Sequence, residues 1–229
     1  MKAAIKFVMI VVGLALIAVS VAGLIFSSRL EGLLRPRLES RLGHIMGTDV
    51  EIAALQIAPA RRGIELIDVT VLNPPSFKLG PALECKKITV RPVLQSLFSS
   101  APAIEEILLD GMIIHLRYEL GEGTNLGYLA RQAASLAEQP ATGWPIMRRA
   151  LRVNSIRCSV ADMKIRSNVT PGIPLSLRIE AFELKDVGDG RPVSAAKLTS
   201  IILKSILMEV VTLKGLFRPL VDLIRGEVQ

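Results

Sequence analysis

The spacing of apolar residues divides the chain into four stretches. Phe7 to Phe26 is an unbroken apolar run in which Ser20 is the only polar side chain. After it come leucines at helical spacing, then a long stretch that mostly alternates apolar and polar positions, then helical spacing again. The pattern predicts a transmembrane anchor over residues 1–27, an amphipathic membrane-exit helix over 28–47, a β-rich domain over 48–192, and C-terminal apolar and amphipathic helices over 193–229.

The first stretch is long enough to span a bilayer. As a helix, Phe7 to Phe26 measures about 30 Å, the thickness of the hydrocarbon core. A cleaved signal peptide is the alternative, because Lys2 and Lys6 precede the run and Ser20-Val21-Ala22 resembles a cleavage site. The run continues to Phe26, beyond most secretory apolar regions, and this favours an uncleaved anchor.

Charge alone does not orient this anchor. Counting the basic residues that follow it favours a cytoplasmic C-terminal domain, whereas a short basic N-terminus is the usual start of an exported signal-anchor. On either side of the membrane, arginines just after the anchor suit anionic headgroups. The membrane-surface candidates are Arg29, Arg35, Arg37 and Arg41.

Turn residues divide the β-rich stretch into strands. Asn73-Pro74-Pro75 ends one strand, and Asp110-Gly111 between two apolar runs predicts a hairpin. A second hairpin is expected near Ala161-Asp162. Residues 104–116 and 153–165 both have apolar residues at their first, fourth and sixth places, followed by a turn that contains Asp. The sequence therefore predicts a repeated hairpin unit.

Two helices accompany these strands. Asn125 is expected to cap a helix over residues 125–138. The helix expected over 194–214 has only a narrow polar stripe, so the sheet, another copy of the chain or lipid must bury it. The predicted fold is α+β and mostly antiparallel, a curved sheet of repeated hairpins with two covering amphipathic helices, behind one N-terminal transmembrane helix.

Composition narrows the classes of partner. The formal charge is +7 and the pI about 9.7, yet the charge is scattered and aromatic residues make up only 4% of the chain. These features favour an anionic membrane surface over nucleic acid. Cys85 and Cys158 could pair in an oxidising compartment, but their apolar neighbours favour two buried free thiols.

The sequence shows no motif for catalysis or cofactor binding. It contains no P-loop, no dinucleotide-binding glycine motif and no nucleophile elbow. Neither His44 nor His115 lies near other residues at metal-ligand spacing. We therefore expect no enzyme activity, no metal and no cofactor.

Residues 1–130 resemble the N-terminal region of the AsmA-like family of bacterial envelope proteins, distant kin of bridge-like lipid-transfer proteins. The order of short phrases carries the resemblance: Glu65-Leu66-Ile67-Asp68-Val69, Asn73-Pro74-Pro75, Ile104 to Gly111, and Asn125-Leu126. The resemblance implies an inner-membrane anchor, a periplasmic domain and an apolar groove for acyl chains. Strands of five to eight residues reach only roughly 17–27 Å, so a role in spanning the periplasm would need a homo-oligomer or an envelope protein partner.

Two sets of apolar residues follow as candidates for function. The lipid-facing candidates are Ile64, Leu66, Ile88, Val90, Ile107, Leu109, Ile114, Leu116, Ile156, Val160, Ile165, Leu177 and Ile179. The same residues would form an ordinary core if the two helices cover them. In the alternative function, a non-catalytic structural subunit of a membrane complex, the partner-docking candidates are Ile202, Ile206, Leu207 and Val210.

Overall fold

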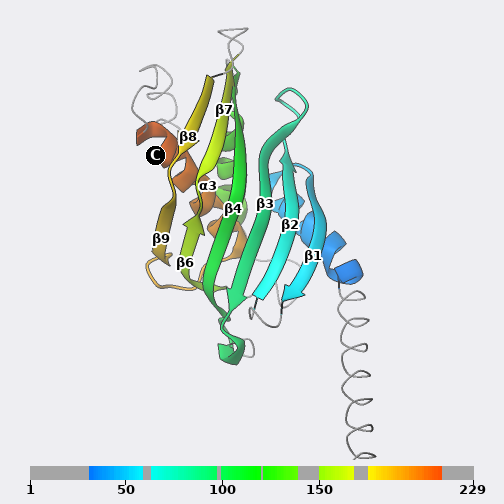
Figure 1. Ribbon diagram of the computed structural model, residues 1–229, viewed down its shortest axis with the longest axis vertical. Helices are drawn as coiled ribbons and strands as arrows, with labels where there is room; N and C mark the ends of the chain where they lie inside the picture. Colours follow the sequence, from blue (N-terminus) through cyan, green and yellow to red (C-terminus); the bar gives the residue numbers. More distant parts are fainter. Residues whose placement is uncertain are drawn as a thin grey trace, which may run out of the picture.

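The computed structural model describes residues 31–58, 63–96, 99–119, 121–138, 150–167 and 175–212. These residues form an α+β fold in which helices lie against one face of a mostly antiparallel sheet (Figure 1). The expected fold class is confirmed at this level. The predicted anchor lies outside the described residues, and none of the helices within them is long and apolar enough to cross a membrane.

The sheet has nine strands, with the main order β1-β2-β3-β4-β6-β9. Neighbours are antiparallel except that β6 and β7 both run parallel to β4. The strands are β1 Val50–Ala58, β2 Gly63–Leu72, β3 Pro81–Pro92, β4 Ala103–Glu119, β5 Gly123–Thr124, β6 Arg152–Cys158, β7 Ala161–Ser167, β8 Leu175–Ile179 and β9 Phe182–Val187.

The expected hairpin at Asp110-Gly111 is wrong, because β4 runs through it as one strand. Gly111 has a φ of +65°, which bends the strand without reversing it. The bend also changes which residues face the core, so that Leu109 and Met112 are both buried although they are three positions apart. Aspartate followed by glycine therefore marks a kink within a strand in this protein.

The second expected hairpin, near Ala161-Asp162, is also wrong. β6 pairs with the first half of β4 and β7 with the second half, so β7 continues the direction of β6. The two repeated segments are nevertheless neighbours. Ile104 pairs with Val153 and Leu116 with Ile165, an offset of 49 residues in both cases. The shared pattern reflects two bent strands that lie side by side, not two hairpins.

The bends line up across the whole sheet. Asp68 of β2 has a φ of +47°. In the sheet register, Asp68 of β2 and Gly111 of β4 lie on either side of the same stretch of β3. Farther along the same line, residues 159–160 separate β6 from β7, and residues 180–181 separate β8 from β9. A common line of kinks and breaks therefore runs through β2 and β4 to the junctions of β6 with β7 and of β8 with β9.

A helix over residues 31–46 starts beside the free edge of β1 and crosses behind this strand, on the face that carries the other helices (Figure 1). Side chains one helical turn apart bond to backbone groups of that edge. Glu31 Oε1 accepts from the Leu55 N–H at 3.1 Å, and Glu39 Oε1 accepts from the Ile52 N–H at 2.9 Å. Between them, Arg35 Nη1 donates to the Ala53 carbonyl at 2.7 Å. The helix thus satisfies groups that an edge strand would otherwise leave free for another strand.

The helices α2 (Asn125–Ala137) and α3 (Ala195–Thr212) pack against each other over the centre of the sheet. The expected cap of α2 is wrong by one residue, since Thr124 Oγ1 accepts from the Gly127 N–H. The Asn125 side chain is instead buried, where Nδ2 donates to the His115 carbonyl at 2.8 Å. This bond ties the start of α2 to β4.

Candidate functional site

The face of the sheet that carries the helices, here called the inner face, is apolar from one edge to the other. Its side chains form rows that cross the strands at right angles, because paired residues in adjacent strands point to the same face. Row 1 is Ile57, Ile64, Val90, Ile107, Ile156 and Leu184; row 2 is Leu55, Leu66, Ile88, Leu109, Cys158 and Phe182. The next two rows, beyond the kink, begin at Ile52 and Val50.

The inner face is closed at one end and partly open at the other. Beyond the kink, Ile52, Val69 and Ile179 are 1–5% exposed. In row 1, Ile57 is 38% exposed, and Ile64 and Val90 are half-buried. The partly exposed members of row 1 lie on β1, β2 and β3 and at Leu184 of β9, whereas the β4 and β6 members are buried.

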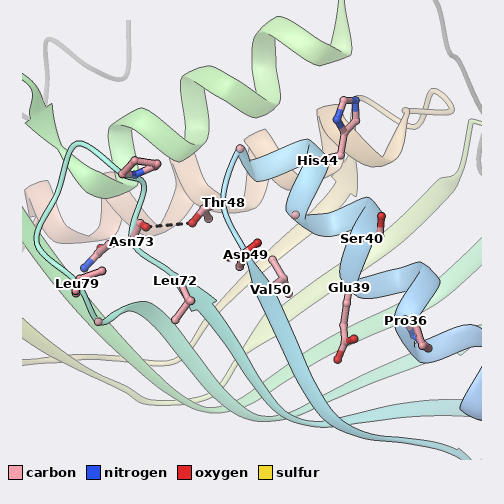
Figure 2. A pocket seen from close by; sticks show the side chains of 14 residues that line it. Pro36, Glu39, Ser40, His44, Thr48, Asp49, Val50, Leu72, Asn73 and Leu79 are labelled. Carbon is pink, nitrogen blue, oxygen red and sulfur yellow. Dashed lines mark hydrogen bonds between the residues drawn. The ribbon is translucent and has the colours of Figure 1, made fainter.

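Three helices produce this difference. Leu34, Leu38, Leu42 and Met46 of the helix over 31–46 pack against the same core as the buried side chains of α2 and α3. Figure 2 shows all three helices on the inner side of the sheet. Row 1 on β1 to β3 is covered less than the part of the inner face beyond the kink on the same strands.

The predicted lipid-facing residues divide into three groups. Eight are buried: Leu66, Ile107, Leu109, Ile114, Leu116, Ile156, Ile165 and Ile179. Ile64, Ile88, Val90 and Leu177 are half-buried, and all of these except Val90 pack at the margin of the core. Val160 is 44% exposed and lies in the kink between β6 and β7, away from the apolar rows. Most of the set forms ordinary core. Of the half-buried group, Ile64, Ile88 and Val90 lie toward the open end, whereas Leu177 of β8 lies beyond the kink.

The predicted partner-docking residues of α3 face mainly inward. Ile206 and Leu207 are 1% and 0% exposed, whereas Ile202 is half-buried. The side chain of Val210 lies outside the described part of the chain. Met208, which the sequence did not single out, is 46% exposed. The apolar side of α3 is thus used to cover the sheet of its own chain.

The predicted membrane-surface arginines have different surroundings. Arg35 is engaged with β1 and also lies 3.5 Å from the Glu39 carboxylate. Arg37 is exposed and Arg41 is half-buried, and Arg29 lies outside the described residues. Sequence periodicity did not reveal the role of Arg35, although the spacing of Glu31, Arg35 and Glu39 places all three on one side of a helix.

Both cysteines are free and buried, the alternative that the sequence favours. They lie on the inner face on either side of the kink. Burial raises the pKa of the Cys158 thiol to about 12, and burial likewise raises the pKa of Cys85. These thiols belong to the core and carry no sign of reactivity.

A cleft of about 880 Å³ with a mixed polar and apolar lining lies at the closed end of the sheet, between the helix over 31–46 and the loops at the ends of β1 and β2. Figure 2 shows Glu39, His44 and Asp49 around it, and the hydrogen bond from Thr48 Oγ1 to the Asn73 carbonyl, 3.1 Å long. Among the described residues, no group of three or more His, Cys, Asp and Glu side chains is placed to hold a metal ion. The cleft offers hydrogen-bonding groups from the helix over 31–46 and from the loops at the ends of β1 and β2.

The outer face of the sheet is charged where the inner face is apolar. Glu106, which is almost buried, pairs with Arg91 and with Arg157 Nη1 at 2.8 Å, and Arg157 Nε also lies 3.1 Å from the Glu183 carboxylate. These side chains neutralise one another across four neighbouring strands. The cluster therefore orders the outer face and leaves the inner face as the candidate site.

Comparisons with known protein families, with curated proteins and with solved structures return no match. The functional argument therefore depends on the open end of the inner face.

Proposed function

We propose that this chain is a single-pass bacterial inner-membrane protein of AsmA-like type. In this proposal, its C-terminal domain lies in the periplasm and binds, passes or helps to organise lipid during envelope biogenesis. The anchor is the apolar run from Phe7 to Phe26. The lipid-binding part is the partly open end of the inner face.

The observation that carries the proposal is the contrast within row 1. Ile57, Ile64 and Val90 are aligned in adjacent strands and remain partly exposed, whereas the same row is buried on β4 and β6. An apolar surface on a curved sheet offers hydrocarbon contacts to an acyl chain without requiring polar partners. A groove for one or two acyl chains along β1 to β3 is the site that fits this surface.

The first test is lipid content. The full chain is purified in a mild detergent, and bound phospholipid is measured by native mass spectrometry and by extraction. We expect phospholipid to co-purify with the wild-type protein. A wild-type protein that carries none, in several detergents, would contradict the proposed function.

A matched pair of variants locates the site. Ile64 and Ile67 are half-buried isoleucines on β2, but only Ile64 packs against the core of the inner face. We expect Ile64→Asp to lower the lipid content at least several-fold and Ile67→Asp to leave it close to wild type. Circular dichroism and thermal unfolding show whether each variant folds. Equal losses in the two folded variants would place the lipid elsewhere.

A further inference from the structure

Exposed large apolar side chains gather at the open end of the sheet. Leu33 is 59% exposed near the start of the helix over 31–46, Ile57 is 38% exposed at the end of β1, and Leu94 is 56% exposed just after β3. Exposed apolar residues that cluster, unlike scattered ones, indicate a surface that meets an apolar partner.

The position of Leu94 follows from the turn that holds it. Leu94 begins the short 3-10 helix η2 (Leu94–Ser96), and Ser96 Oγ accepts from the Ala103 N–H at 2.7 Å. The Val93 N–H donates to the Ala103 carbonyl at 2.9 Å. This turn is therefore fixed against the start of β4, and it projects beyond the ends of the strands (Figure 1).

The chain also enters the described structure at this end. The hydrogen bond between Glu31 and the Leu55 N–H holds the start of the helix beside row 2, which is adjacent to row 1. The predicted anchor ends at Phe26, and five residue steps span at most about 18 Å. The end of the sheet that exposes Leu33, Ile57 and Leu94 must then lie close to the membrane from which the chain emerges.

We propose that this end of the domain rests on the bilayer, with Leu94 inserted among the lipids beside the open row. The inference depends on the membrane anchor of the proposed function and adds an interaction surface to it. The described charges at this end are mixed, since Arg91 pairs with Glu106, and Arg152 lies opposite Ala103, two residues before Glu105. Apolar insertion, more than charge attraction, therefore defines the contact.

The opposite end of the sheet supplies a matched control. Leu79 is 97% exposed, and its carbonyl accepts from Arg117 Nη2 at 3.5 Å, near the end of β4. Leu94 lies near Ala103, at the start of β4. Fourteen residue steps separate these two points of β4, which corresponds to roughly 45 Å in a strand. Leu79 and Leu94 are thus exposed leucines that differ in their distance from the proposed membrane contact.

The experiment places a single tryptophan at each leucine. Leu94→Trp and Leu79→Trp are made in full-length chains that carry Trp144→Phe, and each is reconstituted into phosphatidylethanolamine–phosphatidylglycerol vesicles with brominated acyl chains. We expect the bromine to quench Leu94→Trp fluorescence at least twofold more than that of Leu79→Trp. In vesicles without bromine the two proteins should show matched circular dichroism spectra.

The outcomes separate this inference from the proposed function. If the chain floats with the vesicles but Leu94→Trp is quenched no more than Leu79→Trp, the membrane contact is wrong while the anchor remains. If the chain does not float with vesicles, both the anchor and the contact are wrong. Phospholipid that co-purifies with the protein tests the lipid-binding face independently of both.

Discussion

Ser159 Oγ donates a hydrogen bond to Asp110 Oδ1 at 3.0 Å, and the Gly111 N–H points to the same hydroxyl at 3.3 Å. The contact joins the kink of β4 to the break between β6 and β7. The Ser159 N–H also donates to the Leu109 carbonyl at 2.9 Å. Two neighbouring parallel strand paths thus bend at the same place. The polar groups at the kink of β4 form hydrogen bonds with Ser159 at the break between β6 and β7.

Because of the kink, we predict that any side chain at residue 111 lowers the free energy of unfolding. An added Cβ in Gly111→Ala would lie 2.9 Å from Lys86 Cδ and would stand at a φ of +65°. We expect the free energy of unfolding to fall by about 1–2 kcal/mol. Gly32→Ala is the control, since nothing lies within 4 Å of its added Cβ, and it should be neutral or stabilising by up to about 1 kcal/mol. Chemical denaturation in detergent measures both, and equal effects would contradict the prediction.

The helix that covers the β1 edge predicts that loss of a contact to this edge lowers stability and promotes association. Glu39→Ala removes the acceptor of the Ile52 N–H and the carboxylate beside Arg35. We expect a loss of about 1–2 kcal/mol in stability and more association between exposed edges. Thermal unfolding and light scattering measure these changes. Ser40→Ala, an exposed position of the same helix, should change neither, and similar behaviour of the two variants would argue against the edge contact.

The side-chain amide of Asn125 predicts a loss of stability when it is replaced. Nδ2 donates to Asn73 Oδ1 at 2.7 Å and to the His115 carbonyl, while Oδ1 accepts from the Arg117 N–H at 3.0 Å. Asn125→Asp would replace the Nδ2 donor with a carboxylate oxygen that faces two acceptors, so we expect a loss of about 2–4 kcal/mol in the free energy of unfolding. The exposed Ser135→Ala on α2 is the control. A denaturation midpoint for Asn125→Asp equal to that of the wild type would contradict this role.

The cysteines predict a dependence on pH. Because burial raises the pKa of Cys158 to about 12, the native thiol should react with iodoacetamide at pH 8 far more slowly than the unfolded thiol. The folded pKa lies above the ordinary value of 9.0, so this group's contribution to stability is complete below pH 9 and is lost as the pH rises toward 12. Cys158→Ala should flatten the decline in unfolding free energy over that range. Rapid native labelling would show that the thiol is accessible.

The sequence by itself determined the local elements and their order. Alternation of apolar residues predicted the β-rich region over 48–192 in which the described strands lie, and the Asn73-Pro74-Pro75 turn ended β2 as expected. Helical spacing located α2 and α3, whose bounds agree with the expected ranges to within two residues at each end. These features depend on side chains that are near one another along the chain, and periodicity reports such relations directly.

Only the tertiary structure decided how the strands pair and which apolar residues remain exposed. Asp110-Gly111 has the local chemistry of a turn, but pairing on both sides of β4 holds the strand through it, and Gly111 accommodates the bend. Likewise, Ile64 and Ile107 have the same apolar character and the same row, yet one is half-buried and the other is 6% exposed. Coverage depends on helices distant in sequence, so no pattern along a strand could show where the inner face is open.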